Sequence, residues 1–228
     1  MGTGVAAARH PRPQCTVYSF HVSVHLVRHP IAQDALMALR DRETRSSHFR
    51  RLAHRLTLVV ATEATRSLRT RRTQVASPLE MAEGDVIAAE IVVVPVLRAG
   101  LGMLDAVLEL LPHARVGHIG LSRDEETALA ARYFSKLPGG LASSTVLLID
   151  PMLATGGSAV AAANLLRDAG AVDMRLVCLV AAPEGVATFE AAHPDVPIFT
   201  PVIDRQLNER KFILPGLGDF GDRLYGTS

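Results

Sequence analysis

Residues 146–158, VLLIDPMLATGGS, form the stretch of sequence that decides the fold. A short apolar run ends at Asp150, and the loop after it finishes with two glycines between Thr155 and Ser158. The residues that follow are rich in alanine and have helical spacing. This order predicts a buried strand, a loop and a helix N-terminus, which together bind phosphate through backbone N–H groups and the helix dipole. Asp150, at the carboxyl end of the strand, is placed to contact a sugar attached to that phosphate.

On either side of this stretch, short β-branched runs alternate with helical segments. The predicted strands are residues 91–96, 115–121, 145–150, 175–181 and 196–202, and the predicted helices are residues 100–111, 158–170 and 184–193. Such alternation predicts an α/β fold with a parallel sheet of about five strands and helices on both faces. Ligands of these sheets bind beyond the carboxyl ends of the strands, which is where the loop after Asp150 lies.

The N-terminal third of the chain has a different pattern. A short strand is predicted within residues 22–30, and apolar spacing predicts two helices within residues 31–72. Residues 1–21 are punctuated by prolines and are expected to form a flexible extension. Residues 22–228 have a length typical of one domain.

Composition argues against several classes of protein. The chain of 228 residues is 48% hydrophobic with a net charge of +1, so no overall charge draws it to nucleic acid or a membrane. Its apolar runs are strand-sized, far below the roughly 20 residues of a membrane span. Cys15 and Cys178 are the only cysteines, which argues against a disulfide framework and favours the cytoplasm. The basic run at 66–73 is interpreted as a solvated helix end or an interface rather than a nucleic-acid site.

Several stretches together carry a family resemblance. The glycine loop is not a Walker A motif, because no Lys follows the second glycine, and it is not the dinucleotide G-x-G-x-x-G motif. With Pro151 in place of a second acid, it resembles the phosphate loop of type I phosphoribosyltransferases. Four further stretches are similar to the uracil phosphoribosyltransferase family: VPVLRAGLGMLDAVLELLPHA (94–114), SRDEET (122–127), LVAAPEG (179–185) and PGLGDFGDRLYGT (215–227).

The resemblance covers residues 22–228 and implies both a fold and a reaction. The implied fold is the type I phosphoribosyltransferase fold with a small hood and a flexible loop. The implied reaction joins uracil to phosphoribosyl diphosphate (PRPP), giving UMP and diphosphate in pyrimidine salvage, with Mg²⁺ as cofactor. The resemblance also implies a homodimer or larger homo-oligomer and, as in some relatives, GTP as an effector. No nucleic acid and no membrane are expected as partners.

The resemblance assigns roles in PRPP binding. Arg98 and Arg123 match diphosphate ligands, since a guanidinium can donate two hydrogen bonds to phosphate oxygens. Asp150 is expected to hold the ribose hydroxyls, directly or through Mg²⁺ and water. Because Pro151 replaces a second acid, Mg²⁺ is expected mainly on the diphosphate, and no protein metal ligands are assigned. The remaining residues of the phosphate loop are Met152, Leu153, Ala154, Thr155, Gly156, Gly157 and Ser158.

The C-terminal segment, about residues 203–228, matches the uracil-binding hood of the family. Ile213, Gly218, Asp219 and Phe220 match positions that read the base, largely through backbone groups. Asp219 also matches a position that touches PRPP, and whether it contacts metal-bound water or helps to deprotonate the base stays open. Phe220 stands where many relatives have a small residue, which predicts a narrower pocket.

Alternatives remain at this stage. The glycine loop can be a plain turn that caps a helix, and Arg123, beside three acids, can be a solvated loop residue. On the same fold, a regulator that senses nucleotides and binds RNA is the main rival, although the low net charge argues against it. An enzyme of this fold acting on another base is the third hypothesis.

Overall fold

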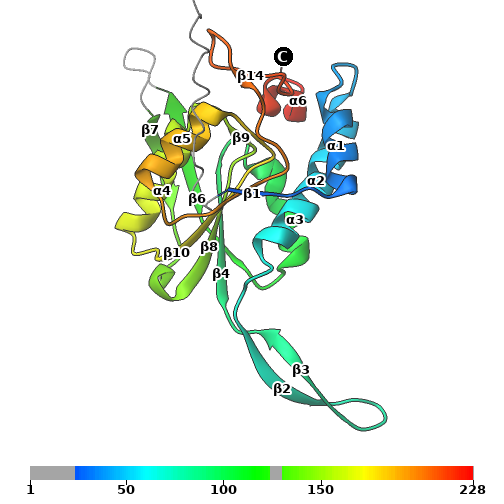
Figure 1. Ribbon diagram of the computed structural model, residues 1–228. Helices are drawn as coiled ribbons and strands as arrows, with labels where there is room; N and C mark the ends of the chain where they lie inside the picture. The colour runs from blue at the N-terminus through cyan, green and yellow to red at the C-terminus, as the bar shows by residue number, and fades with distance from the viewer. Residues whose placement is uncertain (1–23, 124–129, 228) are drawn as a thin grey trace, which may run out of the picture.

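The computed structural model describes residues 24–123 and 130–227 (Figure 1). Of residues 122–123 and 130–132 it describes the backbone alone. The extension expected at residues 1–21 lies outside the described part of the chain.

An eight-stranded sheet forms the centre of the molecule. In spatial order its strands are β1 (Val24–Leu26), β12 (Ile198–Thr200), β10 (Asp173–Val177), β8 (Ser144–Ile149), β4 (Glu90–Leu97), β6 (His118–Arg123) and β7 (Ala130–Lys136), with β5 (Arg115–Val116) also paired to β4. Every pairing is parallel except that of β6 with β7. The prediction of an α/β fold built on a parallel sheet is confirmed, and the sheet is wider than expected because β1 and β7 extend its edges.

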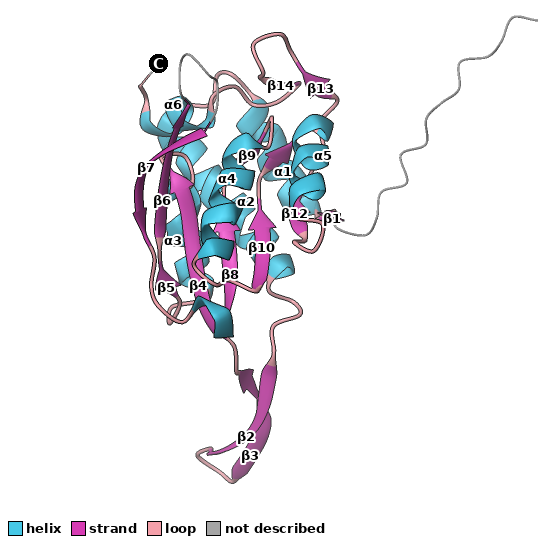
Figure 2. Cartoon of the chain, turned by 90° about the vertical axis from the view of Figure 1, so that its left-hand side faces the viewer, coloured by secondary structure: helices cyan, strands magenta, loops and turns pink. Residues whose placement is uncertain are grey.

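Helices cover both faces of this sheet (Figures 1 and 2). The first face carries α1 (Pro30–Arg40), α2 (Ser46–Ala64) and α3 (Leu101–Leu110), and the second carries α4 (Gly157–Asp168) and α5 (Pro183–Ala192). Each face of the sheet has its own hydrophobic core, and successive side chains of β4 point alternately into the two. Val93 packs in the core with α2 and α3, while Val92 and Val94 pack in the core with α4. Among the described residues, no helix is both long and apolar enough to cross a membrane.

Local sequence explains where several of these helices begin and end. Pro30 opens α1, where its missing N–H costs nothing, and the His29 ring accepts a hydrogen bond from the Ile31 N–H at 3.2 Å. Gly170, with φ 92°, follows the end of α4 and donates its N–H to the Arg167 carbonyl at 2.8 Å. That geometry is typical of a glycine beyond a helix C-terminus.

A hairpin projects from the amino end of the sheet, at the bottom of Figure 1. It consists of β2 (Thr70–Ala76) and β3 (Met81–Ile87), paired antiparallel. The expectation that helix extends to residue 72 was wrong here, because α2 ends at Ala64 and residues 70–72 belong to β2. Polar and β-branched residues in β2 pair well across a two-stranded ribbon, and this pairing outweighs their weak helical spacing.

The phosphate loop and the hood lie at the opposite end of the sheet, where the parallel strands have their carboxyl ends. A short parallel pair, β9 (Met152–Leu153) and β11 (Val180–Ala181), continues from the carboxyl ends of β8 and β10. Above it lie β13 (Gln206–Leu207), β14 (Ile213–Leu214) and α6 (Phe220–Tyr225) (Figure 2). The segment predicted to bind a base therefore lies at the same end of the sheet as the segment predicted to bind a phosphate.

Candidate active site

The phosphate loop is fixed at its start by backbone hydrogen bonds. The Pro151 carbonyl accepts the N–H groups of Leu179 and Val180 at 3.0 and 3.1 Å. The Leu153 carbonyl accepts the Ala182 N–H at 2.9 Å. Pro151 and Leu153 are buried, so these two positions contribute through backbone groups and not through side chains facing a ligand.

The two glycines of the loop have different structural tasks. Gly156 has φ 83°, and a Cβ there would lie 2.8 Å from the Gly185 carbonyl oxygen, so a side chain is excluded by both conformation and space. Gly157 opens α4 and is exposed, and the nearest atom to a Cβ there would be the Thr155 hydroxyl at 3.8 Å. The space in front of Gly157 is therefore open to a ligand.

The N-terminus of α4 fits an anion. In the described part of the chain no side chain caps this twelve-residue helix, whose cap position is Gly156. The first N–H groups of a helix have no partner within the helix and lie at its positive end. With Gly157 and Ser158 both exposed, these groups are placed to bind a phosphate.

Asp150 lies next to this anion site, directly after β8. Its own N–H donates to the Val177 carbonyl at 3.1 Å, and this bond holds the residue at the carboxyl end of β8. Burial raises the pKa of the Asp150 carboxyl to about 7, and a hydrogen bond from the Met152 backbone opposes this rise only in part. The residue as a whole is half-buried, so the crevice reaches a carboxyl group that is itself poorly solvated. A sugar hydroxyl or a cation there would replace the missing solvation.

Arg98 lies directly after the carboxyl end of the neighbouring strand, β4. Pro95 of β4 is in register with Ile149 of β8, so the chain leaves both strands side by side. A Cβ on Gly100 would lie 2.7 Å from the Ile149 carbonyl oxygen, so glycine is required for this close approach. The Arg98 side chain is exposed, consistent with contact to a ligand.

Arg123 is placed by its backbone alone. It ends β6, the strand beside β4, and is paired with Ala130 of β7. Because β4 and β6 are parallel, Arg123 lies at the same end of the sheet as Arg98. The predicted contact with diphosphate concerns a side chain outside the described part of the structure, so it stays a prediction.

The hood leaves some of its predicted base-reading residues exposed and buries others. Gly218, with φ 81°, and Asp219 are exposed, whereas Ile213 is buried. The Asp219 carboxylate accepts the Asp222 N–H at 2.9 Å and so caps α6. One structural task of Asp219 is therefore clear, and its proposed contact with substrate stays a prediction.

Phe220 departs from the expectation of a narrowed pocket. Its side chain is 2% exposed and packs edge to face against Phe49 of α2, with ring centroids 5.2 Å apart. A Cβ on Gly102 of α3 would lie 3.1 Å from the same ring. The aromatic side chain thus fills the core between α2, α3 and α6, and any contact of Phe220 with a base is left to its backbone.

Comparison with known proteins decides the family. The family model for uracil phosphoribosyltransferase matches residues 26–227. The uracil phosphoribosyltransferase of Mesorhizobium japonicum is 49% identical over 205 residues, covering 90% of this chain and 98% of the relative. That of Rhodococcus opacus is 46% identical over 206 residues, covering 90% of this chain and 99% of the relative. The chain belongs to the uracil phosphoribosyltransferase family.

A solved structure agrees with this assignment. The AQ2163 protein from Aquifex aeolicus matches with a TM-score of 0.85 at 34% identity, covering 90% of this chain and 99% of that one. The family model and the named relatives confirm the resemblance inferred from the phosphate loop and the four further stretches, and with it the phosphoribosyltransferase fold. Membership of the uracil phosphoribosyltransferase family also identifies the chain as a phosphoribosyltransferase enzyme.

Sequence reasoning missed the residues that hold the hood of this family member in place. Arg223 of α6 lies 4.6 Å above the Phe49 ring and donates to the Leu217 carbonyl at 2.8 Å and to the Leu39 carbonyl. Arg40 and Asp204 form a second, buried connection. Arg223 lies in the stretch 215–227 that carries the resemblance, but nothing in that stretch indicates its contacts with Leu39 and Phe49. No motif marks Arg40, and the signal for Asp204 is only an isolated acid ahead of the glycine-rich segment.

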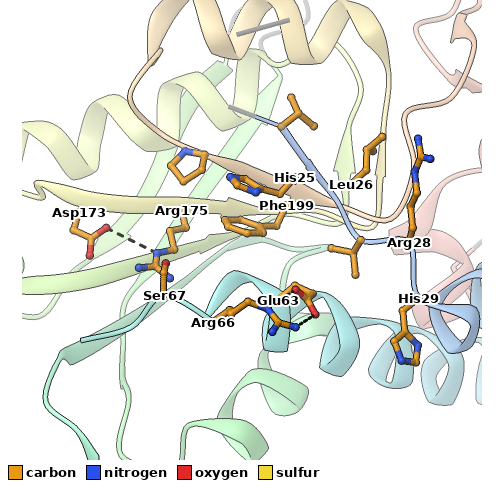
Figure 3. Close-up of a pocket in the computed structure, with 13 residues that line it drawn as sticks. His25, Leu26, Arg28, His29, Glu63, Arg66, Ser67, Asp173, Arg175 and Phe199 are labelled. Atoms are coloured by element: carbon orange, nitrogen blue, oxygen red, sulfur yellow. Dashed lines mark hydrogen bonds and ion pairs between the residues drawn. The ribbon is translucent and has the colours of Figure 1, made fainter. Parts of the chain in front are cut away.

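A cavity of about 720 Å³ runs along the edge strand β1, and none of its lining residues belongs to the phosphate loop or the hood (Figure 3). The stacked rings of His25 and Phe199, 4.5 Å apart, form part of its wall. Two of its charged side chains already have ion-pair partners in the wall, Arg66 with Glu63 at 2.6 Å and Arg175 with Asp173 at 3.9 Å. Its lining extends from Asp173 and Pro197, near the amino ends of β10 and β12, along β1 to Arg28 and His29.

Proposed function

We propose that the protein transfers the phosphoribosyl group of PRPP to uracil, giving UMP and diphosphate. The observation that carries the proposal is the uncapped N-terminus of α4 beside Asp150, on the sheet edge where Arg98 and the hood also lie. Its relatives at 46 to 49% identity are named for this activity. The reaction belongs to pyrimidine salvage, because it rebuilds a nucleotide from a free base.

Outside the hood, the chain supplies three functions to this reaction. The first N–H groups of α4 hold the 5′-phosphate, and Asp150 holds the ribose hydroxyls. Arg98, together with Arg123, neutralises the diphosphate as it leaves. The bond from ribose C1 to the diphosphate oxygen breaks, the bond from C1 to uracil N1 forms, and the N1 proton is released. Because the transition state resembles an oxocarbenium ion, catalysis depends on placing the base and on stabilising the leaving charge.

The hood is proposed to select the base. Uracil presents a fixed pattern of acceptor, donor and acceptor along one edge, which backbone N–H and C=O groups near Gly218 can match. Cytosine would leave some of these groups unpaired, and a buried unpaired polar group costs about 1–3 kcal/mol. Ile213 is buried in the core cluster that also contains Leu217 and Phe220, the residues on either side of Gly218 and Asp219.

We propose Mg²⁺ as the cofactor, carried mainly on the diphosphate. Among the described residues no group of three or more His, Cys, Asp or Glu is arranged to hold a metal ion. Asp150 is the carboxylate beside the phosphate loop, and the cost of ionising its buried carboxyl suits a neighbouring cation. When bound, Mg²⁺ would neutralise charge on the leaving diphosphate. EDTA is expected to abolish turnover and added Mg²⁺ to restore it.

A homo-oligomer is proposed from the projecting hairpin. Its apolar side chains are exposed in one chain, Leu79 by 96%, Met81 by 60% and Val75 by 57%. An exposed apolar surface of this kind favours burial against a second copy. Sedimentation of the full chain should give at least twice the monomer mass of 24.4 kDa, and Leu79→Ser should weaken the association.

GTP activation and a cytoplasmic location complete the proposal. GTP as an effector rests on the family resemblance, and initial rates at subsaturating PRPP, with and without GTP, test it.

A cytoplasmic location is supported by the buried free thiol of Cys178, which suits a reducing compartment. Cell fractionation tests that location.

The decisive experiment is UMP formation from uracil and PRPP with Mg²⁺. Cytosine, hypoxanthine and orotate serve as competing bases in the same assay. UMP formation with uracil and little product from the other bases is expected. No product with uracil, but turnover of another base, would overturn the assignment of substrate while leaving the enzyme class intact.

A further inference from the structure

Asp204 is a buried acid just ahead of the hood. It is 6% exposed, and its carboxylate receives both terminal nitrogens of Arg40, the last residue of α1, at 2.7 and 2.8 Å. This forked geometry is the strongest form of an arginine–carboxylate pair. The pair joins the N-terminal helix to a segment 164 residues further along the chain.

The same pair holds Gly216 from two sides. Arg40 Nη1 donates to the Gly216 carbonyl at 2.7 Å, and the Gly216 N–H donates to Asp204 Oδ2 at 2.9 Å. Gly216 has φ 59°, and a Cβ there would lie 2.2 Å from the Ile213 carbonyl oxygen. Arg40 and Asp204 therefore hold both the N–H and the C=O group of Gly216, which lies between the predicted base-reading residues Ile213 and Gly218.

Asp204 is also connected to the phosphate loop. Its N–H donates to the Ala181 carbonyl at 2.8 Å, and Ile203 forms a parallel bridge with Ala181. Ala181 is in register with Leu153 of β9, within the phosphate loop. A short ladder of backbone hydrogen bonds thus runs from the phosphate loop to Asp204, whose side chain continues it to Gly216.

We propose that Arg40 and Asp204 are positioning residues that set the base-reading segment of the hood at a fixed distance from the phosphate loop. This inference rests on the proposed function, in which the phosphate loop holds the ribose 5-phosphate and the hood holds the base. Transfer needs uracil N1 in line with ribose C1, and a displacement of about 1 Å costs about a hundredfold in rate. Arg40 and Asp204 touch neither substrate in this arrangement.

The proposal differs from a purely stabilising role in what it predicts for the two substrates. Loss of stability alone lowers the unfolding temperature and leaves the ratio of the two KM values unchanged. Loss of positioning weakens the base site and spares the phosphate site, because the α4 N-terminus does not depend on Arg40. The ratio of KM for uracil to KM for PRPP is therefore the informative quantity.

The experiment compares Arg40→Lys and Asp204→Asn with a matched control. Lys keeps the charge of Arg40 and loses the fork, and Asn keeps the shape of Asp204 and loses the charge. The control is Arg167→Lys near the C-terminus of α4, where the guanidinium likewise joins backbone carbonyls, at 2.8 and 3.0 Å, to a carboxylate. Steady-state constants, unfolding temperature and equilibrium binding of UMP and ribose 5-phosphate are measured for the full chain.

We expect Arg40→Lys and Asp204→Asn to lower kcat by up to about a hundredfold, because uracil N1 is displaced from ribose C1. KM for uracil should rise about tenfold, and KM for PRPP should change less than about twofold. UMP should bind about tenfold more weakly, and ribose 5-phosphate should bind as in the wild type. Arg167→Lys should lower the unfolding temperature without changing the KM ratio. If Arg40→Lys does not fold, Asp204→Asn alone decides the outcome.

The positioning role is overturned if both variants leave the KM ratio and UMP binding unchanged, or weaken UMP and ribose 5-phosphate equally. Failure of the proposed function gives a different result, a wild type that forms no UMP. The two binding measurements still decide the positioning role in that case, because they need no turnover. A wild type that binds neither compound overturns both proposals.

Discussion

The phosphate loop and the hood, which are proposed to bind opposite parts of one nucleotide, are held in different ways. The loop is fixed by backbone hydrogen bonds between neighbouring segments, such as those from Leu179 and Val180 to Pro151. The hood is fixed by side-chain contacts with distant helices. Arg40 of α1 donates to Gly216, and Arg223 of the hood donates to the Leu39 carbonyl and lies over the Phe49 ring. Backbone contacts survive most substitutions, whereas a side-chain anchor is lost with one. The hood is therefore the part whose geometry is more sensitive to single substitutions outside the site.

The largest effect is expected from Asp150→Asn in the loop region. Turnover should fall about a hundredfold, the size of loss seen when one preorganised electrostatic contact is removed. At the same time the unfolding temperature at pH 8 should rise, because the variant no longer buries an ionised carboxyl. Asp168→Asn, an exposed acid at the end of α4, is the matched control. Near-normal turnover of Asp150→Asn would remove its assigned role.

The next effect separates the two glycines of the loop. Gly157→Val should raise KM for PRPP more than about tenfold and barely change the unfolding temperature, because its side chain occupies only the open ligand space. Gly156→Ala should destabilise the protein by about 1–2 kcal/mol, the cost of a left-handed backbone, plus the clash with Gly185. Kinetics and thermal unfolding of both variants check this. Equal loss of stability would show that Gly157 also has a packing role.

The pH dependence should trace to the same carboxyl. With its pKa near 7, the ionised form of Asp150 falls about tenfold between pH 8 and pH 6, so KM for PRPP should rise by about that factor if the ionised form binds. Asp150→Asn should lose this part of the profile, while titration of the substrate phosphates remains.

Stability should change with pH in the opposite direction. The folded protein holds a proton on Asp150 between about pH 4 and pH 7 that the unfolded chain has released, so stability falls as pH rises through that window. Urea unfolding at pH 5 and pH 8, compared with Asp150→Asn, measures this contribution. A contribution of the opposite sign would mean that the carboxyl is ionised at pH 5.

The smallest effect is expected from Phe220→Leu in the hood. The ring packs in the core, so the variant should lose about 1 kcal/mol of stability and change KM for uracil less than about threefold. Thymine should remain a poor substrate, since no pocket wall is removed. Efficient use of thymine by this variant would show that the Phe220 ring limits the base site after all.

Sequence alone was informative wherever a signal was local. The strand, loop and helix around Asp150 follow from a few adjacent residues. The hairpin was missed because its two strands pair only with each other, and residues 70–72 also fit a weak helical spacing. The burial of Phe220 was missed because a short glycine-rich segment does not show which face meets the core.

The sequence by itself determined the alternation of the central strands with helices, the glycine loop ahead of α4 and the family. Only the tertiary structure decided how the hood is held over that site. The Arg40 and Asp204 pair, the Arg223 contacts and the packing of Phe220 on Phe49 join residues from opposite ends of the chain. Such contacts follow from three-dimensional packing and leave no periodic or local pattern, because each depends on a partner more than a hundred residues away.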